Sequence, residues 1–234
     1  MSRPRVIPTL LLRQAALVKT VRFGSPAYIG DPINTIRIFN ELEVDEILLL
    51  DILASRQGLG PRFDLIEELA GECFMPLAYG GGVTSLEQAS RLYRLGVEKV
   101  AVNTAAFERE KLIPEIAGRF GSQSVIASID ARRKFLRGWQ VHVRGGSQDT
   151  GLEPTAYAAR LQSLGAGEIL LYSMDRDGTY AGFDLDLIRR VASAVDIPVI
   201  ACGGAGQVSD FAMALRAGAA AVSAGSLFVF QKKG

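Results

Sequence analysis

Four short segments built from glycine and small polar residues could bind a phosphate group. Each follows an apolar run, and they are residues 80–82, Asn103-Thr104, residues 203–206 and Gly225-Ser226. Glycines let backbone N–H groups approach an anion closely, and a helix that begins after the loop adds its dipole. A tight turn alone would explain any one segment. Because the glycine run and the small polar turn occur twice with the same spacing, we favour two phosphate sites and a ligand phosphorylated at both ends.

Three aspartates stand at or just after the end of an apolar run, where they could exchange protons with a ligand. They are Asp51, Asp130 and Asp177, and Asp130 ends the run 124–130. A carboxylate in this position either acts as a general acid or base or fastens a loop. We expect catalysis from Asp130 and leave both roles open for the other two. Lys19 is either a phosphate or lid lysine or a solvated charge.

Metal and nucleophile chemistry find little support in the sequence. The only histidine, His142, follows Trp139 in a segment, 138–146, that is predicted to form a β-hairpin. A metal site is not expected there, because no second histidine is near. No Ser–His–Asp or Cys–His set can be assembled. Cys73 and Cys202 are expected to be free thiols in a reducing compartment, and no cofactor is expected.

Eight apolar runs alternate with longer amphipathic stretches, and these elements must position the polar residues. Near-continuous apolar strands are typical of a parallel sheet covered by helices. Asp31-Pro32 indicates a helix start, and the segment from Thr84 to Glu87 has the spacing of a capping box. The predicted strands are 6–12, 46–51, 75–79, 99–102, 124–130, 168–172, 198–201 and 220–223.

The two halves of the chain resemble each other at a fixed offset. Residues 46–50 (Glu-Ile-Leu-Leu-Leu) recur 122 positions later as residues 168–172 (Glu-Ile-Leu-Leu-Tyr), and the glycine runs at 81 and 203 keep this offset. An α/β barrel made of two four-stranded halves predicts such a repeat. We therefore predict one (β/α)8 TIM-barrel domain over residues 1–234, with its site at the carboxyl ends of the strands. The last helix of the barrel is expected to be missing.

Composition limits the expected partners and compartment. Lysine and arginine number 26 against 25 acidic residues, and the net charge of +1 indicates neither nucleic acid nor a membrane surface as a partner. No apolar run approaches the ~18 residues that span a bilayer. The N-terminus leads into an apolar strand without the cleavage site of a signal peptide. We expect a cytoplasmic protein.

The motifs around these loops resemble those of the cyclase subunit of imidazole glycerol phosphate synthase, a glutamine amidotransferase of histidine biosynthesis. The resemblance runs from about Arg5 to Phe230. Its most distinctive part is the run from Met174 to Thr179, and it includes residues 30–32, 50–55, 79–83, 102–106, 165–171 and 203–206. It implies a barrel that partners a glutaminase subunit and receives ammonia from it.

The resemblance assigns roles to the phosphate loops and to the floor of the barrel. The family's ribonucleotide substrate carries two phosphates. One would contact Gly82, Asn103 and Thr104, and the other Asp177, Gly178, Gly204, Gly225 and Ser226. Lys19 matches the family's first-loop lysine. The charged entrance for ammonia matches Arg5, Glu46, Lys99 and Glu168, all at strand starts. A purely stabilising ring of salt bridges is the other possibility there.

The sequence departs from the family at a catalytic position. The family uses two aspartates at symmetry-related strand ends; one matches Asp130, but Leu11 occupies the position of the other. Leucine cannot transfer a proton, and general acid–base help is typically worth ~10²–10⁴-fold. Tyr172 also replaces a threonine that is usual near the site. We therefore predict a paralogue that keeps the glutaminase, the ammonia entrance and a phosphorylated ligand but closes the imidazole ring poorly.

Such a paralogue resembles proteins that supply ammonia to amidotransferases of bacterial surface-polysaccharide biosynthesis, where a sugar acquires an amidino group. Three alternatives stay open. The chain could be an intact histidine-pathway cyclase, a related barrel isomerase that needs no glutaminase, or a non-catalytic subunit that docks a glutaminase and activates it. The charged entrance argues against the isomerase, which has no use for an ammonia tunnel.

Overall fold

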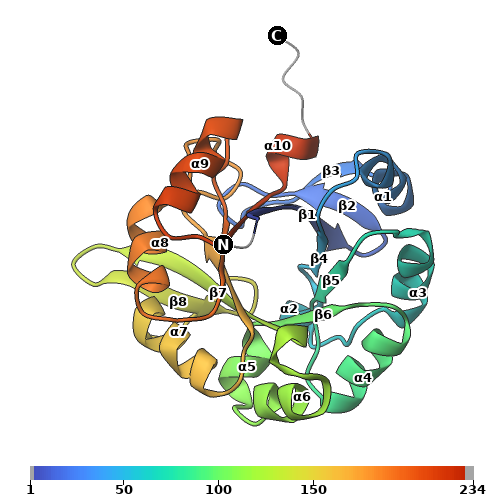
Figure 1. Cartoon of the computed structure of the whole chain (residues 1–234), viewed down its shortest axis with the longest axis horizontal. Helices are drawn as coiled ribbons and strands as arrows, with labels where there is room; N and C mark the ends of the chain where they lie inside the picture. Colours follow the sequence, from blue (N-terminus) through green and yellow to red (C-terminus); the bar gives the residue numbers. More distant parts are fainter. Residues whose placement is uncertain (1–2, 230–234) are drawn as a thin grey trace.

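Eight parallel strands close into a ring in the computed structural model, which describes residues 3–229 (Figure 1). Each strand pairs with the next, and β12 pairs with β1 to complete the circle. Apart from a longer β7, the strand ends agree with the predicted ones to within two residues, and the predicted TIM barrel is confirmed. The strands are β1 (Arg5–Arg13), β4 (Ile47–Asp51), β5 (Leu77–Gly80), β6 (Lys99–Val102), β7 (Val125–Lys134), β10 (Glu168–Ser173), β11 (Val199–Cys202) and β12 (Ala221–Ala224).

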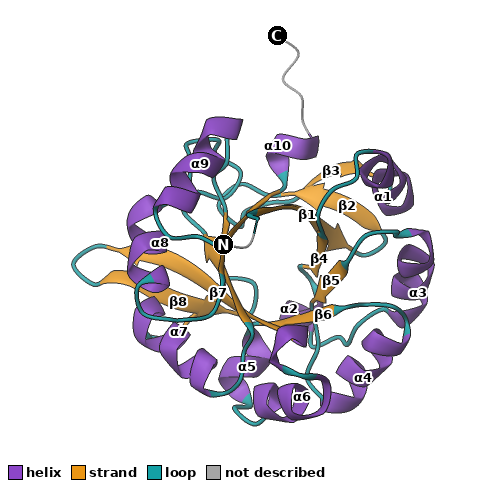
Figure 2. Ribbon diagram, viewed as in Figure 1, coloured by secondary structure: helices purple, strands orange, loops and turns teal. Residues whose placement is uncertain are grey.

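The helices form an outer layer around the ring (Figure 2). The Asp31 side chain caps α1 as predicted, by accepting a hydrogen bond from the backbone N–H of Asn34. The capping box predicted at Thr84 is displaced by one residue, because Ser85 caps α4 and the Gln88 side chain accepts from the Thr84 amide. The helices are α1 (Pro32–Glu41), α2 (Ala54–Gln57), α3 (Phe63–Glu72), α4 (Leu86–Arg94), α5 (Thr104–Glu108), α6 (Leu112–Phe120), α7 (Pro154–Ser163), α8 (Leu185–Ala192), α9 (Val208–Arg216) and α10 (Ser226–Val229), with a 3₁₀ turn at Ser122–Ser124.

Apolar side chains on both faces of the ring are buried. Successive residues of a strand point to opposite faces, so Leu49 packs outward against the helices whereas Leu48 points into the barrel. Burial on both faces explains why the strands are apolar almost throughout. The inner cluster comprises Ile7, Leu48, Ala78, Ala101, Ile126, Leu170, Tyr172, Ile200, Cys202 and Ala221.

Two antiparallel excursions leave the ring at corresponding points of the two halves. The end of β1 pairs with β2 (Ala16–Lys19), which pairs with β3 (Ala27–Gly30). The end of β7 pairs with β8 (Gly138–Val143), which pairs with β9 (Gln148–Asp149). The hairpin predicted within 138–146 extends beyond those bounds, because this segment supplies β8 and part of the turn after it, while the strands that pair with β8 are β7 and β9. The β2–β3 pair had no counterpart among the predicted elements.

The end of the chain lies partly beyond the described residues. Helix α10 begins two residues after the last residue of β12. The sequence predicts that the last helix of the barrel is missing, and residues 230–234, which this prediction also concerns, lie outside the described residues. No helix within 3–229 has the length and apolar character needed to cross a membrane.

Candidate active site at the mouth of the barrel

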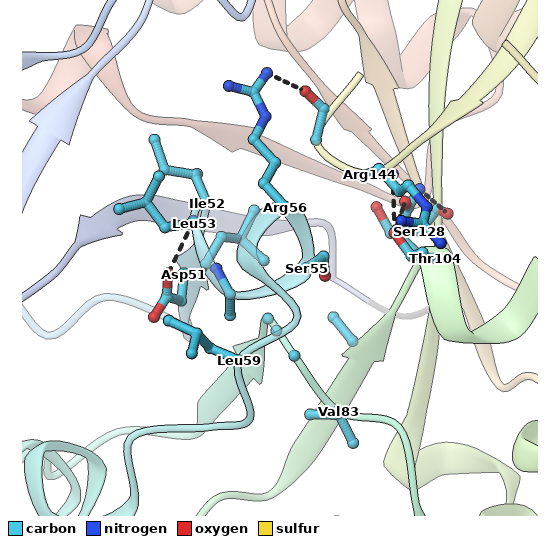
Figure 3. A pocket seen from close by; sticks show the side chains of 18 of the residues that line it. Asp51, Ile52, Leu53, Ser55, Arg56, Leu59, Val83, Thr104, Ser128 and Arg144 are labelled. Carbon is cyan, nitrogen blue, oxygen red and sulfur yellow. Dashed lines mark hydrogen bonds between the residues drawn. The ribbon is translucent and has the colours of Figure 1, made fainter. Parts of the chain in front are cut away.

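A cavity of about 410 Å³ opens at the carboxyl ends of the strands (Figure 3). Segments that follow β4, β5 and β6 contribute to it, together with the loops after β2 and β8 and the ends of β1, β7 and β10. Its lining brings together predicted site residues from distant parts of the chain, namely Leu11, Asp51, Gly82, Asn103, Thr104, Asp130 and Tyr172. A volume of this size suits a small organic ligand.

The first predicted phosphate site forms one wall of this cavity. Gly82 has a φ of +69°, and a Cβ there would lie 2.2 Å from the carbonyl oxygen of Leu59, so only glycine fits. Asn103 Nδ2 donates to the carbonyl oxygen of Ser128 at 3.1 Å, which fixes the start of α5. The backbone N–H of Arg144 donates to Thr104 Oγ1 at 2.9 Å. The two hydrogen bonds hold the Asn103-Thr104 turn beside the cavity, next to the close-packed glycine turn.

Asp130 is the buried acid of the cavity. Burial raises the pKa of its carboxyl to about 7, the charge of Asp177 contributes in the same direction, and a hydrogen bond with Ser128 opposes the rise. A group with a pKa near neutrality can both give and take a proton at physiological pH. Leu11, also buried, lines the same cavity and adds no titratable group.

Asp51 fastens a loop. One carboxylate oxygen accepts the backbone N–H groups of Leu53, at 2.9 Å, and of Ala54, at 3.1 Å; Figure 3 shows Asp51 beside Leu53. Of the two roles left open for this aspartate, these contacts favour the structural one. The turn directs α2 over the cavity, and Arg56 reaches from there to the carbonyl oxygen of Gly145, 2.6 Å from Nη2 (Figure 3).

The second predicted phosphate site surrounds a separate and much smaller cavity of about 30 Å³. Gly178 and Gly204 have φ values of +65° and +109°, and a Cβ on either would lie within 2.3 Å of a neighbouring carbonyl oxygen. Lys19 lines this cavity, and its Nζ lies 6.0 Å from the ring centroid of Tyr180. The other predicted members of the site, Asp177, Gly225 and Ser226, also line it.

Asp177 is buried and accepts hydrogen bonds on both carboxylate oxygens. Thr20 Oγ1 donates to it at 2.6 Å, the backbone N–H of Phe23 at 3.1 Å and the Tyr172 hydroxyl at 2.9 Å. Burial raises the pKa of Asp177, and these three donors partly offset the rise. Its carboxylate therefore ties the loop after β2 to the loop after β10.

Four charged side chains form a closed ring at the opposite end of the barrel. Arg5 contacts Glu46 at 2.6 Å and Glu168 at 2.9 Å, and Lys99 contacts the same two glutamates at 3.0 and 3.2 Å. Positive and negative charges alternate around the ring, and the Glu46 side chain is only 3% exposed. Glu168 Oε2 is buried without a hydrogen-bond partner among residues 3–229. The four residues predicted to act together are thus in direct contact.

The single histidine and the two cysteines are the remaining candidate side chains of the chain. No cluster of three or more His, Cys, Asp or Glu side chains there could hold a metal ion. Burial lowers the pKa of His142, which favours the neutral ring, and burial raises the pKa of the Cys202 thiol to about 12, so the sulfur stays protonated. Cys73 and Cys202 are both free thiols.

Sequence reasoning missed the residues that the two excursions bring to the mouth. Arg144 follows β8 and Phe23 lies between β2 and β3, and both line the large cavity. No motif marks either residue. Their positions depend on antiparallel pairings that were predicted with too short a segment in one case and not predicted in the other.

The sequence is closely similar to known proteins. A family model described as "Histidine biosynthesis protein" matches residues 5–233. A Pseudomonas aeruginosa protein provisionally named imidazole glycerol phosphate synthase subunit hisF2 is 54% identical over 234 residues, which cover 100% of this chain and 93% of that protein. The imidazole glycerol phosphate synthase subunits HisF of Mycobacteroides abscessus and Nocardia farcinica are 44% and 45% identical; each match covers 97% of this chain, and 91% and 90% of those proteins. The chain therefore belongs to the histidine biosynthesis protein family and is similar over its whole length to HisF subunits.

Proposed function

We propose that this chain is the ammonia-receiving synthase subunit of a glutamine amidotransferase. A glutaminase subunit would release ammonia at the floor of the barrel, and a phosphorylated ligand would bind at the mouth. The names of the relatives support this class of protein, since they are subunits of imidazole glycerol phosphate synthase.

The ring formed by Arg5, Glu46, Lys99 and Glu168 is the observation that carries the proposal. It lies at the strand starts, and the inner apolar cluster separates it from the cavity at the mouth. Replacing a buried ion network with apolar side chains is often neutral or stabilising, so stability alone gives a weak reason for four charges there. Glu168 Oε2, which has no hydrogen-bond partner among residues 3–229, is an acceptor that an entering ammonia molecule could use.

The chemistry at the mouth depends on Asp130 alone. Its carboxyl can donate or accept a proton near pH 7, whereas Leu11 offers no second acid. Formation of an imidazole ring needs several proton transfers, and losing one of two cooperating groups lowers the rate by about 10²–10⁴-fold. We therefore propose a paralogue of the HisF subunits that receives ammonia but closes the imidazole ring slowly.

The ammonia would finally amidinate a sugar of a surface polysaccharide. Two points support this part of the proposal: the resemblance to polysaccharide-pathway proteins described above, and the replacement of the second acid by Leu11. With one acid, the barrel would no longer serve histidine biosynthesis efficiently.

Glutamine hydrolysis by a glutaminase subunit from the same organism tests the proposal. Adding this chain should stimulate hydrolysis, and the released ammonia should stay within the complex when its acceptor is present. The double variant Arg5→Met/Lys99→Met should still bind the glutaminase but leak ammonia to the solvent. Failure of the chain to bind any glutaminase would contradict the proposal. Stimulation without any ammonia transfer would favour the non-catalytic activator, and rapid imidazole formation would favour the intact cyclase.

A further inference from the structure

The hairpin formed by β7 and β8 projects beyond the ring of helices, and the apex of this arm is apolar (Figure 1). Phe135 and Leu136 lie in the turn between the two strands and are 93% and 90% exposed. They are the two most exposed large apolar side chains of residues 3–229. Single exposed apolar side chains are common on protein surfaces, but two adjacent ones at the apex of a projecting arm indicate an interaction surface.

The base of the arm is fixed to the barrel. The buried Trp139 ring contacts two guanidinium groups, those of Arg133 and Arg190, at 5.1 and 5.4 Å from its centroid. Its Nε1 donates to Asp184 Oδ2 at 2.9 Å. The amide of Arg133 donates to Asp175 Oδ2 at 2.7 Å. These contacts hold the base, so the apex is presented from a fixed position.

Basic side chains surround the apex. Residues 132–137 (Arg-Arg-Lys-Phe-Leu-Arg) contain four of them and no acid. A groove beside the apex, which Phe135 and Leu136 also line, adds Arg22 and Arg176. Its two acids, Asp175 and Asp184, already accept the hydrogen bonds that hold the base of the arm. The surface at this end of the arm is therefore strongly positive.

Little of this positive charge is neutralised by neighbouring acids. Lys134 pairs with Asp149 at 3.3 Å, and within residues 3–229 this is the only ion pair of segment 132–137. The even balance of charge over the whole chain, on which the expectation of no membrane partner rests, averages over this segment. An anionic surface would be attracted to the arm in particular.

An apolar apex within a collar of basic side chains suits the surface of an anionic membrane. Phenylalanine and leucine enter the boundary between headgroups and acyl chains, while arginine and lysine are attracted to anionic lipids. A fluid bilayer receives a convex apex without a preformed pocket, whereas an acidic protein would need a surface of complementary shape. The projecting form of the arm therefore favours the membrane.

We propose that the apex of the β7–β8 hairpin is a peripheral membrane-binding element that takes anionic phospholipid. Phe135 and Leu136 enter the interface, and Arg132, Arg137 and the neighbouring basic side chains contact the headgroups. One small apolar apex gives a reversible attachment. The inference does not depend on the proposed function, because it uses neither the cavity at the mouth nor the ring at the floor.

Sedimentation of the full chain with lipid vesicles tests the inference. The wild type should bind vesicles of equal parts phosphatidylcholine and phosphatidylglycerol at least tenfold more tightly than vesicles of phosphatidylcholine, and added salt should weaken this binding. Phe135→Ser/Leu136→Ser should lower the affinity at least tenfold, as should Arg132→Gln/Arg137→Gln. Phe74→Ser is the matched control, because Phe74 is 85% exposed but precedes β5, at the opposite end of the barrel. It should bind like the wild type.

Insertion of the apex can be followed directly. Phe135→Trp places an indole there, and its fluorescence should shift to shorter wavelength when the phosphatidylglycerol vesicles are added, over a constant signal from the buried Trp139. No vesicle binding by the wild type would overturn the proposal and leave an acidic protein as the partner to which the same charges point. Binding that either double variant leaves unchanged would also overturn it.

Discussion

Leu11 and Asp130 occupy equivalent positions in the two half-barrels. Leu11 pairs with Leu50 on the next barrel strand, and Asp130 pairs with Tyr172 in the same way. Each is also the first residue of its strand that pairs antiparallel with its own excursion, Leu11 with Val18 and Asp130 with His142. A barrel with this symmetry could carry an acid at both positions, and this one carries an acid at one.

Restoring the missing acid should trade stability for ring-forming activity. In Leu11→Asp a buried apolar side chain is replaced by a carboxyl in the cavity that Asp130 also lines, and we expect a loss of roughly 2–4 kcal/mol in the free energy of unfolding. We also expect at least a tenfold gain in imidazole formation from ammonium salts. Leu11→Asn is the matched control, since asparagine has nearly the same shape as aspartate and cannot titrate. An equal gain in both variants would argue against acid–base chemistry at this position.

Asp130 should make the stability of the protein depend on pH. Its pKa is about 7 in the folded protein against an ordinary 3.8, so the unfolded chain releases this proton first as the pH rises. The stability associated with the protonated group is fully present below pH 3.8 and is lost as the pH rises to 7. Asn cannot ionise, so between pH 4 and pH 8 the free energy of unfolding of Asp130→Asn should rise relative to that of the wild type by on the order of 4 kcal/mol. Urea unfolding across this range measures the difference, and a difference that does not change with pH would contradict the prediction.

The ring at the barrel floor should be sensitive to the loss of one charge. In Glu46→Gln, Arg5 and Lys99 each lose one of their two carboxylate partners, and we expect a loss of about 2–4 kcal/mol. The exposed pair between Arg37 and Glu72 is the control. Because solvent screens that pair, Glu72→Gln should leave the urea midpoint almost unchanged. Equal effects of the two variants would mean that the ring is an ordinary surface network.

The glycine turn of the large cavity should tolerate no side chain. Gly82→Ala combines a positive φ with a Cβ that would lie 2.2 Å from the Leu59 carbonyl oxygen, and should cost roughly 3 kcal/mol or more and abolish phosphate binding. Gly58 has a similar φ of +66° but open space around it. Gly58→Ala should therefore cost about 1 kcal/mol and leave phosphate binding intact. Thermal unfolding and phosphate titration of both variants make the comparison.

The barrel and its repeat were predictable because buried parallel strands appear in the sequence as near-continuous apolar runs. Runs such as residues 168–172 are apolar on both faces, and the offset of 122 positions repeats through several elements. The position of the cap of α4 differed by one residue, since Thr84 and Ser85 are chemically equivalent choices and Gln88 decides between them.

The grouping of the site residues was predictable in part. Strand ends of a barrel meet at one mouth, so Gly82, Asn103 and Asp130 had to lie near one another. The position of Tyr172 between the two cavities was not predictable, because it depends on the contacts of this side chain with Phe23 and Asp177. Phe23 comes from an excursion whose pairing leaves no regular pattern in the sequence.

The central claim is that this barrel has given up efficient imidazole ring closure because Leu11 stands opposite Asp130 in the half-barrel symmetry. The most direct measurement is the steady-state rate of imidazole glycerol phosphate formation from the histidine-pathway ribonucleotide and ammonium salts, beside HisF of Nocardia farcinica. We predict a rate at least 100-fold below that of the relative, in line with the ~10²–10⁴-fold value of acid–base help, with recovery in Leu11→Asp and further recovery when Tyr172→Thr is added. A wild-type rate equal to that of the relative would contradict the claim.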